Sequence, residues 1–250
     1  MGEHPAARVQ TIVAAHPEDL ADKAASLVLD CIREALRTRG GARVALSGGS
    51  TPRATHRALA RLLRDQGVPV GDIHWFFGDE RWVEATSPES NEGMARETLL
   101  SAIGAAETTI HSWGAGVGDP VECAGRYAGV VRGGMAAGMP VFDVLVLGMG
   151  ADGHTASLFP GATAHFPDGR RAPVSAELGG DAAAVTRGGA PGWRLTLCPD
   201  LLNHCGTVAF LATGSDKTAA LARARAGGSD TPAAWIRGRI TYFIVTRDTI

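Results

Sequence analysis

The sequence predicts an α/β fold in which a mostly parallel sheet carries helices on both faces. Short apolar runs alternate along the chain with segments whose apolar residues recur at helical spacing, an order typical of parallel sheets. One run, Val141–Leu147, is almost unbroken in its hydrophobicity, as expected for a strand covered on both faces. Because open parallel sheets bind ligands at the carboxyl ends of their strands, we expect the chemistry in the loops that follow these runs.

The predicted helices and strands follow from spacing and from residues that begin or end helices. A helix over Pro17–Arg39 ends at Gly40-Gly41, and a second begins near Pro52 and runs to about Gln66, since proline suits a first helical turn. Further predicted helices are Glu89–Ala102, Val121–Ala137, Lys217–Ala226 and Ala233–Arg237. The predicted strands are Arg43–Leu46, Ile73–Phe77, Val141–Leu147, Arg194–Leu197, Val208–Ala212 and Ile240–Thr246.

The length and composition are those of one globular domain. The 250 residues are 45% hydrophobic and 20% charged, which is ordinary for such proteins and enough for a sizeable core. No repeat or low-complexity linker divides the chain, so we interpret residues 1–250 as a single α/β domain. The Gly/Ala-rich stretch around Gly179–Gly192 is predicted to be a surface loop within it.

The net charge and the cysteine content indicate what kind of ligand the protein binds and in which compartment it is found. The net charge is −2, and no dense Lys/Arg run marks a nucleic-acid surface. The longest apolar stretch is too short to span a bilayer, and the N-terminal residues show no secretory signal. The 4 cysteines form no CxxC pair, so we expect reduced thiols and a cytoplasmic protein. The predicted partner is a small molecule, with no nucleic acid and no membrane.

The segment Gly148–Gly153 matches the GxGxxG pattern but does not predict a dinucleotide site. That fingerprint must open a long helix, whereas Pro160-Gly161 interrupts the chain soon afterwards. Asp152 also places a carboxylate where a pyrophosphate would lie. We therefore predict no nicotinamide or flavin cofactor.

Between a predicted strand and a predicted helix lies a loop suited to phosphate, made by Gly48, Gly49, Ser50 and Thr51. Glycines let backbone amides approach a ligand, and the helix N-terminus carries partial positive charge. The alternative is an ordinary turn in which Ser50 or Thr51 caps the helix. Spacing alone does not decide between these interpretations.

Polar clusters follow two further strands. Asp79, Glu80 and Arg81 come directly after Ile73–Phe77; a surface ion pair is the alternative, but the position at a strand end favours a functional role. Asp152 and His154 follow Val141–Leu147, and histidine is well suited to move protons near neutral pH.

Two roles remain to be weighed, that of Asp152 and His154 and that of Lys217. The alternative role for Asp152 and His154 is metal binding, but no further His/Asp cluster accompanies them at metal spacing, so we predict no metal. Lys217, at the start of a predicted helix, either faces a phosphate or is an ordinary solvated lysine.

Several of these segments resemble, in order, the motifs of 6-phosphogluconolactonases. They are Leu46–Pro52 (LSGGSTP), Phe77–Trp82 (FGDERW) with Ser90-Asn91, Leu147–Gly161 (LGMGADGHTASLFPG), Arg194–Leu197 with Leu202-Asn203, and Thr213–Lys217. The similarity runs from about residue 8 to the C-terminus, and DGHTASLFPG is its most specific part. The family shares its fold with glucosamine-6-phosphate deaminases and ribose-5-phosphate isomerases.

The resemblance implies hydrolysis of 6-phospho-D-glucono-1,5-lactone to 6-phospho-D-gluconate in the oxidative pentose phosphate pathway, without cofactor or metal. It implies that His154 activates water, that Arg81 lies near the lactone carboxyl group or the phosphate, and that Asp79 and Asp152 line the pocket or orient partners. It further implies a phosphate pocket formed by Gly48, Gly49, Ser50 and Thr51, with Arg194 and Lys217 as cations. Which cation holds the phosphate stays open.

Two rival functions remain at this point. A deaminase or isomerase of amino-sugar phosphates uses the same fold, although Arg81 and the HTASLFPG continuation favour the lactonase. A non-catalytic sugar-phosphate sensor would need a DNA-binding appendage, for which we see no room outside the α/β domain. The chain departs from the family pattern at Glu84, where proline is frequent, and at Cys198, where threonine or serine is usual.

Overall fold

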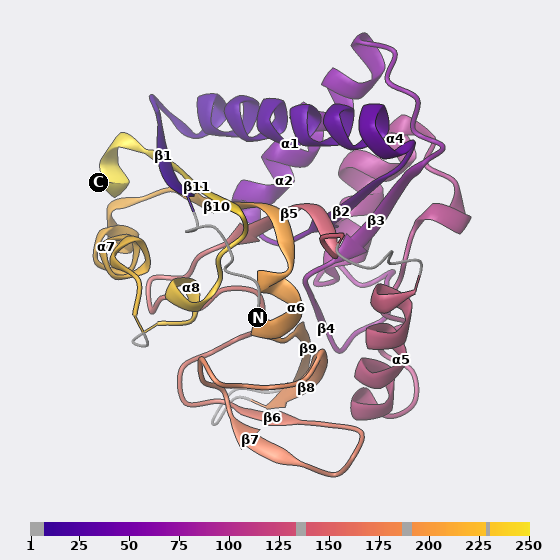
Figure 1. Cartoon of the computed structure of the whole chain (residues 1–250), viewed down its shortest axis with the longest axis vertical. Helices are drawn as coiled ribbons and strands as arrows, with labels where there is room; N and C mark the ends of the chain where they lie inside the picture. The colour runs from indigo at the N-terminus through magenta and orange to yellow at the C-terminus, as the bar shows by residue number, and fades with distance from the viewer. Residues whose placement is uncertain (1–7, 134–138, 187–191, 229–230) are drawn as a thin grey trace.

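The computed structural model describes residues 8–133, 139–186, 192–228 and 231–250, and its strands form two sheets (Figure 1). The larger is wholly parallel and has the order β1-β11-β10-β5-β2-β3. Its strands are β1 (Arg8–Ala14), β2 (Ala42–Leu46), β3 (Ile73–Phe77), β5 (Phe142–Gly148), β10 (Cys205–Ala212) and β11 (Ile240–Thr246).

The second sheet is antiparallel and has the order β4-β9-β8-β6-β7. Its strands are β4 (Asp79–Arg81), β6 (Thr163–His165), β7 (Arg171–Pro173), β8 (Ala182–Thr186) and β9 (Trp193–Leu197). Only one residue, Gly78, separates β3 of the first sheet from β4 of the second. The chain therefore passes between the sheets at the carboxyl end of β3.

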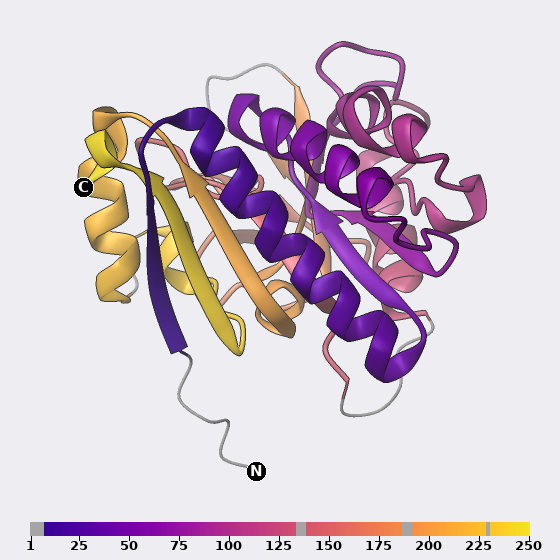
Figure 2. The same ribbon diagram turned by 90° about the horizontal axis from the view of Figure 1, so that it is seen from above.

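Helices lie on both faces of the parallel sheet, as predicted. Figure 2 shows α1 (Pro17–Arg39) and α2 (Ser50–Asp65) across one face, and α7 (Thr218–Ala226) and α8 (Pro232–Trp235) on the other. The remaining helical segments are α3 (Asn91–Ala95), the π-helical η1 (Arg96–Leu100), α4 (Ser101–Ile103), η2 (Glu107–Thr109), α5 (Pro120–Arg132), α6 (Pro199–Asn203), η3 (Ser215–Lys217) and η4 (Arg247–Thr249). In the described residues, no helix is long and apolar enough to cross a membrane.

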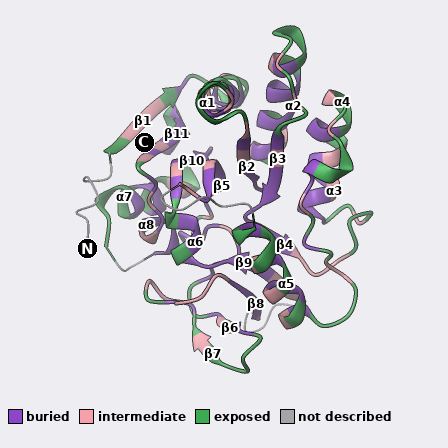
Figure 3. Cartoon of the chain, turned by 45° about the vertical axis from the view of Figure 1, so that its right-hand side comes forward, coloured by how far each residue is buried: buried purple, intermediate pink, exposed green. Residues whose placement is uncertain are grey.

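Helix α1 illustrates how the sequence specifies an element. Leu20, Ala24, Val28 and Ile32 recur every four residues and are all fully buried, which is the stripe that packs a helix on a sheet. Gly40 ends the helix with φ 75°, a left-handed conformation that glycine adopts without strain. One hydrophobic cluster includes residues of both sheets and of the covering helices (Figure 3).

The pairing register of the parallel strands brings the loops that follow them to one edge of the sheet. Strand β2 pairs with β3 from Ala42↔Ile73 to Leu46↔Phe77, so the two strands end level with each other. Strand β5 pairs with β2 through Ala45↔Leu145 and with β10 through Gly148↔Leu211. The chain therefore leaves all four strands at the same edge of the sheet, where convergence was predicted.

Of two predictions about the stretch from Gly179 to Leu197, the first is wrong and the second is confirmed. The predicted surface loop contains β8, a central strand of the second sheet, in which Ala182 to Val185 are buried; residues 187–191 lie outside the described residues. Alanines favour strands weakly, but their small side chains let β8 pack closely on α5. The strand predicted at Arg194–Leu197 is confirmed as β9, which lies in the antiparallel sheet.

Strand β1, at the edge of the parallel sheet, was not predicted. Its burial does not alternate, so the sequence carries no two-residue period there. Helix α5 is described to Arg132, and residues 134–137 of the predicted helix lie outside the described residues.

Candidate active site

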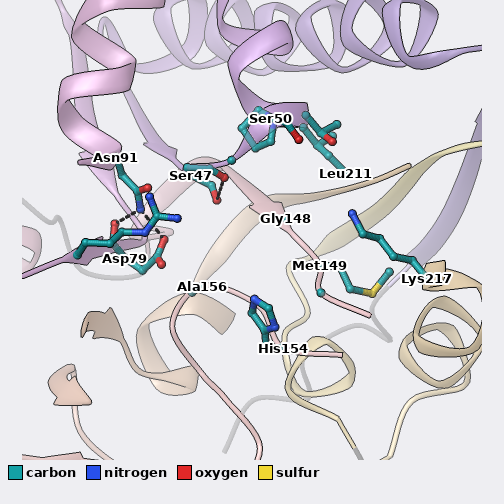
Figure 4. A pocket seen from close by; sticks show the side chains of 16 residues that line it. Ser47, Ser50, Asp79, Asn91, Gly148, Met149, His154, Ala156, Leu211 and Lys217 are labelled. Atoms are coloured by element: carbon teal, nitrogen blue, oxygen red, sulfur yellow. Dashed lines mark hydrogen bonds between the residues drawn. The ribbon is translucent and has the colours of Figure 1, made fainter. Parts of the chain in front are cut away.

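A cavity of about 260 Å³ opens at the carboxyl edge of the parallel sheet (Figure 4). Its walls come from the loops after β2, β3, β5 and β10, which are far apart in the sequence. The lining residues are Ser47, Gly48, Gly49, Ser50, Thr51, Pro52, Asp79, Arg81, Asn91, Gly148, Met149, Gly150, His154, Ala156, Leu211 and Lys217. The four loops predicted to converge therefore do so.

One end of the cavity is formed by the start of α2. Gly49 is the N-cap residue with φ 110°, and no side chain caps the helix, so the interpretation of Ser50 or Thr51 as N-cap is wrong. The first backbone N–H groups of a helix have no acceptor within it, and here they border the cavity. Together with the helix dipole, they form a place for an anion.

Lys217 adds a cation to this anion end. It lies at the end of η3, after β10, and lines the same cavity as Ser50 (Figure 4). In the part of the chain that the structure describes, its ammonium group makes no ion pair. The Thr51 and Thr213 hydroxyl oxygens are 3.4 Å apart and join the α2 loop to the loop that precedes η3.

At the other end, His154 is paired with Asp152. The His154 Nδ1 is 2.5 Å from Oδ1 of Asp152, which also accepts from the His154 backbone N–H at 3.1 Å. An ionised carboxylate only accepts hydrogen bonds, so Nδ1 carries the proton and Nε2 keeps its lone pair. Asp152 itself is not among the residues lining the cavity; it holds the ring of His154 from behind.

Two glycines make room for this pair. A Cβ at Gly150 would lie 2.2 Å from Nδ1 of His154, and a Cβ at Gly153 would lie 2.7 Å from Cβ of Thr231. Gly153 also has φ 85°, and its carbonyl accepts from the Ala233 N–H at 3.0 Å. Two of the three glycines that suggested a nucleotide motif, Gly150 and Gly153, therefore serve the close packing of the His154 loop.

Asp79 is a buried carboxylate in the cavity wall. Its Oδ2 accepts from the Ser157 hydroxyl at 2.8 Å, and its Oδ1 accepts from Nδ2 of Asn91 at 3.1 Å. Burial raises the pKa of Asp79. Hydrogen bonding by Ser157, the positive charges of Arg81 and Arg194, and the charge of His154 when its ring is protonated oppose that rise in the pKa.

Glu80, the next carboxylate, has a structural role. It accepts from the backbone N–H groups of Arg81, Asn91 and Glu92 at 2.7–2.8 Å and from the Ser90 hydroxyl at 3.0 Å. Burial raises its pKa, and these hydrogen bonds oppose the rise. Glu80 thereby binds the otherwise unpaired N–H groups at the start of α3.

The two predicted arginines lie side by side. Arg81 on β4 and Arg194 on β9 are directly opposite each other in the antiparallel ladder. Arg81 lines the cavity, whereas Arg194 does not. One Arg81 Nη1–H donates to the Glu89 carbonyl at 2.7 Å, so this guanidinium is partly fixed in place.

Most of the predicted site residues thus meet in one cavity, while Asp152 contacts His154 and Arg194 is paired with Arg81 across β4 and β9. Sequence reasoning assigned no role to Asn91, Ser157 or Ala156. Asn91 was visible in the Ser90-Asn91 motif, and Ser157 within HTASLFPG, but their contacts with Asp79 link elements that the sequence does not show to be neighbours. Within the described residues, no three His, Cys, Asp or Glu side chains gather as metal ligands would.

The fold and the cavity have the layout of α/β proteins that take small anionic ligands at the carboxyl edge of a parallel sheet. Residues 15–244 match the family described as glucosamine-6-phosphate isomerases/6-phosphogluconolactonase. The chain belongs to this family.

Curated relatives and solved structures agree with that assignment. The 6-phosphogluconolactonase of Synechocystis sp. is 37% identical over 216 residues, which are 85% of this chain and 83% of the relative. The enzyme of that name from Rhizobium meliloti is 34% identical and the match covers 86% and 87%. The structure of 6-phosphogluconolactonase from Trypanosoma cruzi has a TM-score of 0.76 at 30% identity, covering 99% of this chain and 98% of that one.

A monomeric glucosamine-6-phosphate deaminase also has this fold. Its TM-score is 0.78, its sequence identity 20%, and the match covers 97% of this chain and 98% of that one. At this identity the likeness concerns the fold alone, since one fold carries several activities.

Proposed function

We propose that this protein hydrolyses 6-phospho-D-glucono-1,5-lactone to 6-phospho-D-gluconate, a step of the oxidative pentose phosphate pathway. The observation that carries the proposal is the pairing of His154 with Asp152 in the same cavity as the uncapped N-terminus of α2. The relatives named 6-phosphogluconolactonase at 34–37% identity support it.

His154 acts as the general base. Asp152 holds Nδ1–H, so Nε2 takes a proton from a water molecule as that water attacks the lactone carbonyl carbon. The carbonyl oxygen becomes an oxyanion, which the Arg81 guanidinium beside Asp79 stabilises. When the intermediate collapses, the bond from the carbonyl carbon to the ring oxygen breaks, and the ring oxygen receives the proton from His154. Ester hydrolysis of this kind transfers no electrons, so the proposal requires no redox cofactor.

Binding of the substrate's phosphate group positions the lactone ring. We assign it to the end formed by Gly48, Gly49, Ser50 and Thr51 with Lys217, because backbone donors, hydroxyl groups and an ammonium group meet there. Arg194 lies opposite Arg81 in the β4–β9 ladder, and its positive charge acts on Asp79 at the other end. Binding energy from the phosphate then holds the lactone carbonyl near His154, which raises the rate of the chemical step.

The proposal also concerns the number of domains in the chain and the compartment in which the protein works. We propose one catalytic domain, since β4 of the second sheet supplies Asp79 and Arg81 to a cavity built mainly on the first. We also propose a cytoplasmic location, in keeping with the free thiols of Cys31, Cys123, Cys198 and Cys205.

The test is a direct assay of lactone opening. Purified protein is added to freshly made 6-phosphogluconolactone, and proton release is compared with spontaneous hydrolysis and with gluconolactone that lacks the phosphate. We expect strong acceleration for the phosphorylated lactone only. An unchanged spontaneous rate, together with ammonia release from glucosamine 6-phosphate, would transfer the protein to the deaminase branch of the family.

A further inference from the structure

Asn91 lies between the two ends of the cavity and contacts both. It is 2% exposed, and Figure 4 shows it beside Asp79 at the wall of the cavity. Its Nδ2 donates to the Asp79 carbonyl oxygen at 2.9 Å and to the Asp79 Oδ1 at 3.1 Å. Because both neighbours of Nδ2 are acceptors, the amide is held in one orientation.

That orientation directs the Asn91 Oδ1 toward the phosphate loop. A Cβ built on Gly48 would lie 1.6 Å from this oxygen and 2.5 Å from Cγ, and its three nearest heavy atoms all belong to Asn91. The Oδ1 is buried without a hydrogen-bond partner among the described residues. The amide is thus wedged between Asp79 and the Gly48 backbone.

The position of Asn91 is itself fixed from behind. Glu80 accepts from the Asn91 backbone N–H at 2.7 Å and from the Ser90 hydroxyl at 3.0 Å, so the start of α3 cannot shift without breaking hydrogen bonds to a buried carboxylate. On the far side of Asp79, Ser157 donates to Oδ2 at 2.8 Å. The contacts run from Gly48 through Asn91 and Asp79 to the loop that carries His154.

We propose that Asn91 is a positioning residue that joins the Gly48–Gly49 loop to the Asp79 carboxylate, so that the phosphate end and the reacting end of the cavity hold one fixed spacing. The steric link between Asn91 and Gly48 follows from the contacts alone, whereas the effect of Asn91 on turnover rests on the proposed function. A phosphate seated on the Gly48–Gly49 loop is thereby at a set distance from the groups that act on the lactone carbonyl, which is the requirement for efficient positioning.

Gly48 allows a direct test, because its φ is not in the left-handed region and the three heavy atoms nearest to an added Cβ all belong to Asn91. The experiment compares wild type, Asn91→Ala, Gly48→Ala and the double variant. We expect Asn91→Ala to lower kcat about tenfold or more, the usual loss when a hydrogen bond to a charged group is removed. Gly48→Ala should lose at least as much in the wild-type background, and the two losses should fall short of adding in the double variant, because the added Cβ no longer meets the Asn91 amide.

Two further readouts separate positioning from general damage. Two groups act on the acid side of the kcat/KM profile, His154 as the base and Asp79 in the cavity wall. In Asn91→Ala the fall that belongs to Asp79 should move to higher pH, because this buried carboxylate loses one of its hydrogen-bond donors. Gln66→Ala removes an exposed amide at the end of α2, and Gly71→Ala adds a Cβ in open space; both controls should match wild type.

The outcomes are distinct. If Gly48→Ala is as harmful without the Asn91 amide as with it, or if Asn91→Ala keeps the wild-type kcat and pH profile, the proposal is overturned. Melting temperatures of the same four proteins test the steric link without any assay of turnover, and Gly48→Ala should destabilise only the protein that retains Asn91. If the wild-type protein is inactive on the lactone, the proposed function is overturned. The melting temperatures of the four proteins would still decide whether Asn91 and Gly48 are linked.

Discussion

The two ends of the cavity are built in opposite ways. The anion end consists of backbone groups of Gly48 to Thr51, at an uncapped helix start, with one lysine. The other end consists of side chains that hold each other: Asp152 holds His154, and Asn91 and Ser157 hold Asp79. An anion needs several donors from one direction, whereas a base needs one nitrogen in a defined tautomer.

This difference predicts different consequences of substitution. At the anion end, side-chain changes remove part of a larger set of donors, and binding should suffer more than chemistry. At the base end, a single substitution removes the group that moves the proton. The substitutions that follow run from the largest expected effect to the smallest.

His154→Asn should give the largest loss. Asparagine keeps a polar side chain but cannot act as the base, and loss of one general base typically lowers the rate about 10²–10⁴-fold. The loss should fall on kcat, with inorganic phosphate still competing at its wild-type inhibition constant. A pH–rate profile corrected for hydroxide-driven opening provides the measurement. A variant with near wild-type kcat and an unchanged acid limb would make Asp79 the next candidate for the base.

Lys217→Ala should weaken the anion end with a smaller effect on chemistry. A charge-assisted hydrogen bond contributes about 1.5–3 kcal/mol, which corresponds to about a 10- to 150-fold loss in kcat/KM for the phosphorylated lactone. Most of the loss should appear in KM. Lys217→Arg keeps the charge and serves as the matched control. If gluconolactone without phosphate loses as much as its phosphorylated counterpart, Lys217 does not act on the phosphate.

The helix of the anion end also carries a buried histidine that makes the fold sensitive to acid. His56 in α2 is 1% exposed, and burial lowers its pKa to about 4 from the usual 6.5. Between these values the unfolded chain binds more protons than the folded one, so the free energy of unfolding falls as the pH falls from 6.5 toward 4. Below pH about 4 the free energy of unfolding has lost the full contribution of His56, which is about 3 kcal/mol.

His56→Leu should remove this part of the pH dependence. Its loss of stability between neutral pH and pH about 4.5, measured by urea denaturation, should be smaller than that of wild type by roughly 2 kcal/mol. His16→Asn is the control, since His16 is exposed and asparagine also caps a helix. Parallel stability curves for wild type and His56→Leu would show that His56 does not set the acid limit.

Local signals predicted those parts of the structure that depend on neighbouring residues. The strand at Ile73–Phe77 and the helix at Pro17–Arg39 were predicted with their observed bounds, because apolar spacing and terminal Pro and Gly residues act within a few positions. Strand β8 of the second sheet was missed for the opposite reason. It consists of three alanines, a valine and a threonine, whose local signal for a strand is weak, and it is a strand because β6 and β9 pair with it on either side.

The same division applies to the candidate site. The sequence by itself determined most strands of the parallel sheet and the helices α1 and α2, the glycine-rich start of α2 and the Asp152-Gly153-His154 loop, because these depend on local conformation. Only the tertiary structure decided that Asn91 lies between Gly48 and Asp79, that Arg194 lies opposite Arg81, and that Glu80 binds the start of α3 instead of lining the cavity. The physical reason is that side-chain contacts across a cavity depend on how the two sheets and α3 pack, and no local pattern encodes that packing.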